Sequence, residues 1–234
     1  MAAFDAISFT TAVVQGDWVE IWTDVPGMFT TNPHGVESAR LIKELTYEEA
    51  QELASCGAKV LHPRCIEPLK THKIPLHICW TLHPDIQGTV IHSSCAQVKG
   101  AKIKAIQSKR GVHIISMDSP GMWKKVGFLS EIFQCFRERG LSVDLITTSQ
   151  TNVTVTLDPL SDQFDKTVMK SLVESLKEFC NPTHIAPCAV VSIVGRNIRS
   201  VLHEIAPVLE AFKEKKVYLL SQSASDLNLS FTTS

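Results

Sequence analysis

The pattern of apolar and polar residues from 111 to 158 predicts a strand, a helix and two further strands. An apolar run at 112–117, bounded by a glycine and a Ser-Pro-Gly loop, is typical of a buried strand. Residues 128–136 place apolar side chains on one face of a helix, which Gly140 is suited to end. In the last strand, apolar residues at 153, 155 and 157 alternate with threonines, as expected for a sheet with one solvated face. Strand, helix and two strands form the first part of a βαββαβ module.

A second copy of this pattern follows further along the chain. Residues 216–223 repeat the sequence pattern of 142–149 at a distance of 74 positions, and the helical pattern of 129–136 recurs at 202–209. A repeat of this length indicates a duplicated domain, because solenoid repeats are shorter. The second copy reaches residue 234 directly after its third strand. We expect a strand at 102–108 to complete it, with the first module inserted within the second.

The first 92 residues have a different pattern. Predicted strands at 19–23 and 75–80 enclose two helices, of which one opens with a capping box at Thr46–Glu49 and the other begins near Pro63. Strand, helix, helix and strand form an α/β layer with too few strands to be covered by helices on both faces. A polar connector at 93–100 is the predicted boundary.

The sequence therefore predicts a partial α/β layer followed by α+β modules. We expect the layer at 1–92, a linker at 93–100, a first module at 101–186 that lends the strand 102–108 to the second, and a truncated second module at 187–234.

Composition excludes several classes of partner. The net charge is −1 and 20% of the residues are charged, which does not favour binding to nucleic acid or an anionic membrane. No apolar run approaches the roughly 20 residues that span a bilayer, and the first residues do not have the pattern of a secretory signal. The seven cysteines have no CxxC spacing, so we expect reduced thiols in a cytoplasmic protein. The nine histidines are scattered, and we predict no structural metal site.

Several motifs resemble aspartate kinases. Residues 21–33, IWTDVPGMFTTNP, resemble the segment of these enzymes that follows the glycine-rich substrate loop, and residues 47–50 and 57–63 resemble the next two signatures. Residues 127–129 and 142–149 are similar to the first ACT domain, most of all in the lysine-sensitive kinases, and residues 223–229 to the second. The resemblance covers almost the whole chain from residue 19. It implies the end of an amino acid kinase domain followed by two ferredoxin-like ACT modules.

The resemblance implies an enzyme that phosphorylates L-aspartate to 4-phospho-L-aspartate, the first step of lysine, threonine and methionine biosynthesis. ATP with Mg²⁺ would be the second substrate, and lysine would inhibit by feedback. The lysine- and glycine-rich phosphate loop and the aspartate loop of the family do not occur in this sequence. Because phosphoryl transfer relies on such positioning groups, we assign no catalytic residue and expect the chain to be inactive alone. The alternative is a non-catalytic regulatory chain that binds an amino acid and pairs with a catalytic subunit.

The resemblance also implies a nucleotide site at Thr23, Asp24, Phe29, His34, Lys59 and Val60. Thr23 and Asp24 end a strand, where α/β folds place ligands, although an Asp before Val-Pro-Gly is also a common turn residue. His34 stands where these kinases commonly have an arginine, which is a stronger phosphate ligand. Lys59 follows a helix, whose terminal carbonyls could equally hold it.

An effector site for lysine is implied in the first ACT module. Its residues belong to a loop leading into a helix and to the facing strand: Met122, Lys125, Val126, Leu129, Ser142, Val143, Asp144 and Ser149. Amides at the helix start suit a carboxylate, and Asp144 could accept the ammonium groups of lysine. The alternative for Asp144 is an ordinary exposed residue on a strand. We also expect a dimer, either with a second copy or with a catalytic subunit, because ACT edge strands commonly pair between chains.

Overall fold

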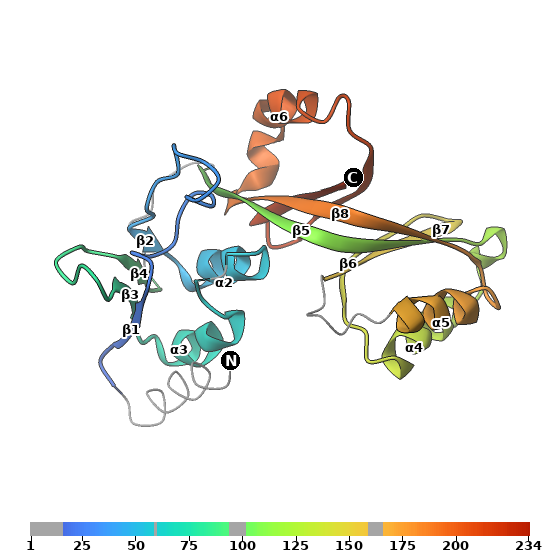
Figure 1. Cartoon of the computed structure of the whole chain (residues 1–234), viewed down its shortest axis with the longest axis horizontal. Coiled ribbons are helices and arrows are strands. Elements are labelled where there is room, and N and C mark those ends of the chain that lie inside the picture. Colours follow the sequence, from blue (N-terminus) through green and yellow to red (C-terminus); the bar gives the residue numbers. More distant parts are fainter. Residues whose placement is uncertain (1–15, 59, 94–101, 159–165) are drawn as a thin grey trace. The chain divides into compact units, whose positions relative to one another are not determined.

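The computed structural model describes residues 16–58, 60–93, 102–158 and 166–234 (Figure 1). These residues form two compact units, each assembled from three stretches of the chain. Unit 1 takes its residues from Met1–Ser108, Ser192–Val208 and Gln222–Leu229. Unit 2 takes its residues from Lys109–Val191, Leu209–Ser221 and Ser230–Ser234. Most of the predicted linker lies outside the described residues.

Unit 1 contains a four-stranded sheet. Its strands are β1 (Val19–Thr23), β2 (Glu44–Leu45), β3 (Leu76–Trp80) and β4 (Thr89–Ile91), in the order β1-β3-β4-β2. The strands β1 and β3 run parallel, with Val19 opposite Leu76, while β4 is antiparallel to β3. The two strands predicted from the sequence are therefore confirmed, and β2 and β4 are additions that are too short to show a periodic pattern.

Two helices connect β2 to β3 in unit 1. They are α2 (Tyr47–Ser55) and α3 (Ile66–His72), the second preceded by a short 3₁₀ turn, η1 (Pro63–Cys65). The predicted capping box at the start of α2 is confirmed, since the Thr46 hydroxyl accepts from the Glu49 amide and the Glu49 carboxylate accepts from the Thr46 amide. The buried faces of both helices share one core with β1 and β3, which also takes in Ala105 and Val194.

The second sheet has six strands, and unit 2 contains residues of each of them. In chain order these are β5 (Lys102–Asp118), β6 (Val143–Thr148), β7 (Asn152–Leu157), β8 (Asn181–Arg196), β9 (Val217–Gln222) and β10 (Asn228–Thr233). Their order in the sheet is β6-β7-β5-β8-β10-β9. The strand β7 is antiparallel to both of its neighbours, and the register of β5 against β7 places His113 opposite Leu157.

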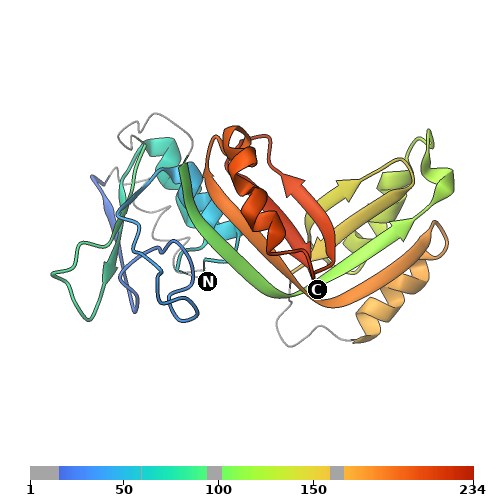
Figure 2. The same cartoon turned by 90° about the horizontal axis from the view of Figure 1, so that it is seen from above.

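Two helices of unit 2 pack on one face of this sheet, α4 (Phe128–Glu138) and α5 (Lys166–Leu176) (Figure 2). Phe128, Ile132 and Phe136 of α4 are buried, as their helical spacing predicts. Together with Met169, Leu172 and Leu176 of α5 they cover the inward-facing residues of β5 and β7. The elements β5, α4, β6, β7, α5 and β8 follow one another in the βαββαβ order.

Two strands are longer than their sequence patterns predict. The strands expected at 102–108 and 112–117 form the single strand β5, which continues through Gly111 with a φ of 78°, a value that glycine adopts without strain. The apolar pattern from Ala189 to Val194 also predicts a strand, and in the structure this strand begins earlier, at Asn181. The sequence pattern did not predict the first part of β8 as a strand because it contains Pro182 and Pro187. Prolines lack the amide hydrogen that a strand residue usually donates.

The helical segment of the second sequence copy also differs from its expectation. Residues 198–205 form a 3₁₀ helix, η3 (Ile198–Ile205), and only α6 (Ala206–Glu210) is α-helical. Pro207 contributes to this difference, since a proline inside a helix removes one hydrogen bond and clashes with the carbonyl four residues earlier. The sequence also predicts a helix that starts at Ser161 or Asp162 and runs to about Phe179, and both start positions lie outside the described residues.

None of the helices in the described parts of the chain combines the length and the apolar character that crossing a membrane requires.

Candidate functional site

The residues of the predicted nucleotide site lie in unit 1, mostly in loops. Thr23 ends β1, and its hydroxyl donates to the Asp24 carboxylate at 3.1 Å. The Thr23 carbonyl accepts from both the amide and the hydroxyl of Thr81, each at 2.9 Å. These bonds tie the carboxyl ends of the parallel strands β1 and β3 together, which is the edge where an α/β layer places ligands.

The other members of this set bond to residues outside it. The Phe29 carbonyl accepts from the Gln107 side chain at 3.2 Å, and the His34 amide donates to the Asn32 side chain at 3.0 Å. Val60 is half-buried against the core of unit 1. The structure therefore brings Thr23 and Asp24 into contact and holds Phe29 through β5, while Lys59 lies outside the described residues. The nucleotide site stays a prediction.

The loop side of the predicted effector site lies in unit 2, before and within α4. Met122 is half-buried in a 3₁₀ turn, η2 (Pro120–Met122). Lys125 forms an ion pair with Glu131 at 3.0 Å, Val126 is 98% exposed and Leu129 is 42% exposed. These side chains border the first turn of α4, whose N-cap Gly127 makes no side-chain cap and whose first amides have no partner within the helix.

The strand side of the same site is β6 with the turn that follows it. Ser142 is exposed and Val143 packs against the core of unit 2. The Ser149 hydroxyl accepts from the amides of Thr151 and Asn152, at 3.4 and 3.0 Å, and shapes the turn into β7. Ser149 therefore has a structural role in this turn, and its predicted effector contact stays untested.

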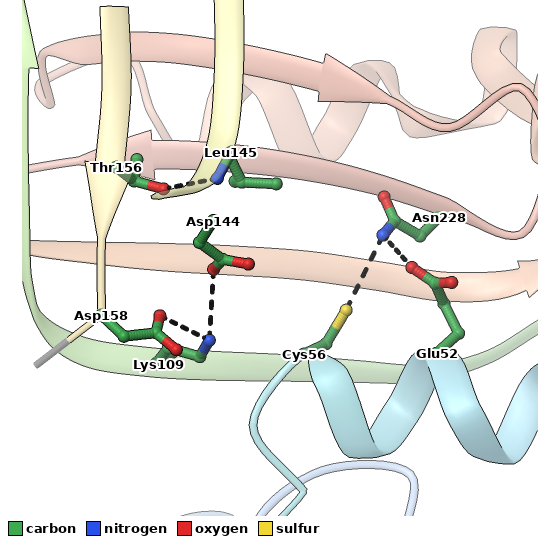
Figure 3. A network of polar contacts seen from close by, with 8 residues as sticks. All are labelled: Glu52, Cys56, Lys109, Asp144, Leu145, Thr156, Asp158 and Asn228. Carbon is green, nitrogen blue, oxygen red and sulfur yellow. Dashed lines mark hydrogen bonds and ion pairs between the residues drawn. The ribbon is translucent and has the colours of Figure 1, made fainter. Parts of the chain in front are cut away.

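Asp144 belongs to an ion cluster that the sequence did not predict, here named the Lys109 cluster and consisting of Lys109, Asp144 and Asp158 (Figure 3). The Lys109 ammonium lies 3.2 Å from the Asp144 carboxylate and 2.7 Å from that of Asp158. The three side chains come from β5, from β6 and from the residue after β7. The predicted ammonium acceptor thus binds an ammonium group of its own chain.

A β-bulge directs Asp144 into this cluster. Val143 pairs with Leu157 but Ile146 pairs with Val155, so that two residues of β6, 144 and 145, face the single residue Thr156. Bulges of this kind re-aim a side chain and are common beside functional sites. The Thr156 hydroxyl is buried and accepts from the Leu145 amide at 2.9 Å, so the extra residue has its hydrogen bond (Figure 3).

The electrostatics of the Lys109 cluster follow from its partial burial. Burial raises the pKa of Asp144 above its usual range, the Lys109 charge lowers it and the Asp158 charge raises it further, with a net rise. Burial by itself would lower the pKa of Lys109, but the hydrogen bond to Asp158 and the two carboxylate charges outweigh it, so that this pKa is raised. Lys109 stays charged, and the two carboxylates share one cation.

The sequence offers one signal for the residues that were missed, Lys109, Thr156 and Asp158. The antiparallel register of the strands at 112–117 and 153–157, with His113 opposite Leu157, carries Asp158 to Val112, three positions from Lys109 and within reach of its long side chain. The βαββαβ order implies this pairing, whereas the separation of 49 positions between Lys109 and Asp158 gives no local pattern.

Two cavities among the described residues have linings that contain none of the predicted site residues. In unit 2 a cavity of about 190 Å³ lies on the sheet, and its polar lining consists of Ser116, Thr154, Thr183, Lys216 and Tyr218. In unit 1 a cavity of about 290 Å³ lies beside Glu20, Trp22 and His77. Among the described residues, no three His, Cys, Asp or Glu side chains gather as a metal site would require.

Comparisons with known proteins place the chain first in a class and then in a family. Residues 5–79 match the model of the amino acid kinase family. The chain is 32% identical to "Aspartokinase 1, chloroplastic" of Arabidopsis thaliana and 33% identical to "Lysine-sensitive aspartokinase 3" of Escherichia coli, in each case over 91% of this chain. The crystal structure of E. coli aspartokinase III in complex with aspartate and ADP is similar with a TM-score of 0.87, at 29% identity over 98% of this chain and 52% of that chain.

The chain belongs to the aspartokinase family over the region that it shares with these relatives. That region is 38% of the Arabidopsis protein and 47% of the E. coli protein, so the chain spans less than half of the length of either.

Proposed function

We propose that this chain is part of an aspartate kinase, which transfers the γ-phosphoryl group of ATP to the β-carboxylate of L-aspartate and gives 4-phospho-L-aspartate. The observation that carries this proposal is the similarity, over 98% of the chain, to an aspartokinase that was solved with aspartate and ADP. Such a reaction would open the biosynthesis of lysine, threonine and methionine. We also propose a cytoplasmic setting, because the seven cysteines have no CxxC spacing and are expected to be reduced thiols.

In this proposal unit 1 contributes nucleotide contacts through Thr23, Asp24, Phe29, His34, Lys59 and Val60. The Thr23–Asp24 contact at the end of β1 and the Gln107 bond to the Phe29 carbonyl support this assignment. Magnesium would arrive with ATP and be held largely by the phosphates. Phosphoryl transfer needs further positioning groups, so we expect the chain to bind nucleotide weakly and to be inactive alone.

We further propose that the second sheet is made of two ferredoxin-like ACT modules, the first inserted in the second. The strand order supports this reading, because β6-β7-β5-β8 and β5-β8-β10-β9 are two four-stranded sets that share β5 and β8. The early part of β5 would be the strand that the first module lends to the second. The proposed boundaries are those predicted from the sequence, 101–186 and 187–234.

Lysine is the proposed feedback effector, since one relative is a lysine-sensitive aspartokinase. Its carboxylate would bind at the start of α4, near Met122, Lys125, Val126 and Leu129. Its ammonium groups would bind on the strand side, near Ser142, Val143, Asp144 and Ser149. The Lys109 cluster supports this orientation, because Asp144 already accepts an ammonium group there.

A second candidate function is a non-catalytic regulatory chain that senses an amino acid and pairs with a catalytic subunit. The observation that favours it is the Lys109 cluster itself, which is more completely assembled than the predicted nucleotide site and uses residues of unit 2 alone. In either case β6 and β9, at the two edges of the second sheet, could pair with another chain. Their exposed apolar residues Ile146, Val217 and Leu220 support such pairing.

Isothermal titration of the purified chain with L-lysine, L-threonine and ATP-Mg²⁺ tests these proposals. Lysine binding without ATP binding supports the regulatory chain and rules out a self-sufficient kinase. ATP binding supports the nucleotide site, and an aspartate phosphorylation assay then measures activity. Binding of threonine alone would replace lysine as the effector, and binding of none of the three would contradict both candidate sites.

Sedimentation of the chain tests the proposed pairing. A homodimer is expected, and an Ile146→Lys variant on the edge strand β6 should shift it toward monomer. A monomer at all concentrations would leave pairing with a catalytic subunit as the remaining form of the proposal.

A further inference from the structure

We propose that Lys109 determines the specificity of the effector site by competing for Asp144. The ammonium of Lys109 occupies, within the protein, the position that an ammonium group of the effector would take. An amine effector must therefore displace Lys109 from Asp144 before its own ammonium can bind. This proposal rests on the proposed function, in which Asp144 is the effector's ammonium acceptor.

The distances in the Lys109 cluster show which of its two contacts is easier to exchange. The Lys109 ammonium lies closer to Asp158, at 2.7 Å, than to Asp144, at 3.2 Å. When an effector takes Asp144, Lys109 keeps its shorter contact with Asp158 and is not left unpaired. Exchange at Asp144 therefore avoids the cost of an isolated, partly buried charge.

Solvent exposure makes the carboxylates accessible. The side chain of Lys109 is 18% exposed, whereas those of Asp144 and Asp158 are 37% and 50% exposed. A solute can thus approach either carboxylate from the solvent while the ammonium remains held between them (Figure 3).

The charge balance leaves room for a second cation. Two carboxylates share one ammonium, so the Lys109 cluster has a net charge of −1 when both acids are ionised. An incoming ammonium group brings this charge to zero. An effector with a neutral side chain gains no electrostatic attraction at this position, so the Lys109 cluster selects effectors that carry an additional ammonium group.

The bulge in β6 keeps Asp144 in place without Lys109. Asp144 is directed by the register shift between Val143 and Ile146 and by the Thr156 hydroxyl, which holds the Leu145 amide. Neither contact involves Lys109. Removing the ammonium should therefore free a correctly placed carboxylate, and the affinity for lysine should rise.

Calorimetric titration of the wild-type chain and of Lys109→Met tests this proposal, with L-lysine and L-norleucine as ligands. Norleucine is lysine without the side-chain ammonium. We expect Lys109→Met to bind lysine about three- to tenfold more tightly, a range that fits the modest strength of partly exposed ion pairs. The affinity for norleucine should stay unchanged. A lower or equal lysine affinity, or an equal gain for norleucine, would overturn the proposal.

A second variant is needed because Lys109→Met leaves the carboxylates of Asp144 and Asp158 facing each other, and their repulsion could destabilise the fold. Lys109→Met/Asp158→Asn removes one charge of each sign and leaves Asp144 alone, and it should also bind lysine more tightly than the wild type. Lys109→Arg keeps the cation and should keep the wild-type affinity. If lysine binds the wild type but the double variant is no tighter, only the competition is refuted. If lysine binds no variant, the proposed effector site fails as well.

Discussion

Unit 1 and unit 2 each contain an ion pair between segments far apart in the sequence, and the two differ in burial. In unit 1, Arg196 lies 2.7 Å from Glu49, whose side chain is completely buried. In unit 2, Lys109 lies between two carboxylates that are 37% and 50% exposed. The distances are similar, so the difference in their roles comes from their access to solvent.

The buried pair of unit 1 is suited to stability. One Glu49 oxygen accepts from the Thr46 amide in the capping box of α2, and the other faces Arg196 at the end of β8. The approach of Arg196 is an ion pair whose geometry falls outside that of a hydrogen bond. No solute can replace Arg196 without opening the core. The Lys109 cluster, by contrast, can exchange a partner while the fold stays closed, so exposure separates a structural pair from a candidate binding site.

The largest expected effect is the loss of the buried pair. Glu49→Ala should lower the free energy of unfolding by about 3 kcal/mol, at the low end for a buried pair because Arg196 is one-third exposed. Urea unfolding measures this change. Glu48→Ala is the matched control in the same helix, where the exposed pair with Lys70 is worth at most about 1 kcal/mol. Equal effects of the two variants would show that burial does not distinguish these pairs.

Loss of the Asp144 charge should act on binding more than on folding. Asp144→Asn should weaken lysine binding at least tenfold, about 1.4 kcal/mol, because an amide cannot replace the carboxylate as an ammonium partner. Its effect on the free energy of unfolding should stay below about 1 kcal/mol, as for other exposed ion pairs. Parallel calorimetry and urea unfolding separate the two effects. If Asp144→Asn unfolds easily but binds lysine as before, the Lys109 cluster is a structural ion pair and not a binding site.

Removal of the Thr156 hydroxyl, which binds the bulge of β6, should have an intermediate effect on stability. Thr156→Val should cost about 1–2 kcal/mol, since it leaves the Leu145 amide without its acceptor. Thr232→Val is the matched control, because Thr232 is equally buried and its hydroxyl has no hydrogen-bond partner among the described residues. That substitution should be nearly neutral. Thermal unfolding compares the two variants, and a Thr156→Val protein as stable as Thr232→Val would show that the bulge does not depend on this bond.

The smallest expected effect is a shift in pH dependence. In the proposed effector site, lysine binding would need the ionised form of Asp144, and the pKa of this group is raised by burial and by the charge of Asp158, against the opposing charge of Lys109. Binding should therefore weaken on acidification at a higher pH than for an ordinary aspartate. Asp158→Asn removes a charge that raises this pKa, so the loss should move to lower pH. Calorimetry across the acidic range measures both midpoints, and identical midpoints would contradict the assigned coupling.

The sequence predicted the parts of the fold that have a local cause. The capping box at Thr46 starts α2, and the spacing of Phe128, Ile132 and Phe136 marks the buried face of α4. The extension of β8 to Asn181 was missed because prolines argue against a strand when the neighbouring strands are unknown. The local sequence pattern was thus sufficient to predict that these elements exist, but it was insufficient to predict where they begin and end.

The candidate site shows the same limit. Asp144 was singled out from the resemblance to aspartate kinases, but its partner Lys109 lies 35 positions earlier and is brought to it by the pairing of β5 with β7. The bulge at 144–145 is equally hidden, because a strand pattern with strict alternation gives no sign of an extra residue. Residues that depend on pairing between strands were found only in the structure.

The strands β5 and β8 each supply residues to both units, and this bears on how the gene can change. Unit 2 consists of Lys109–Val191, Leu209–Ser221 and Ser230–Ser234, so no single crossover between two genes transfers it whole. A recombination event within β5 or β8 would join half-strands from different ancestors, whose side chains were never selected to fit one another. Unit 1 and unit 2 are therefore inherited together, and a new specificity of the proposed effector site has to arise by point substitution, for which position 109 is the first place to look.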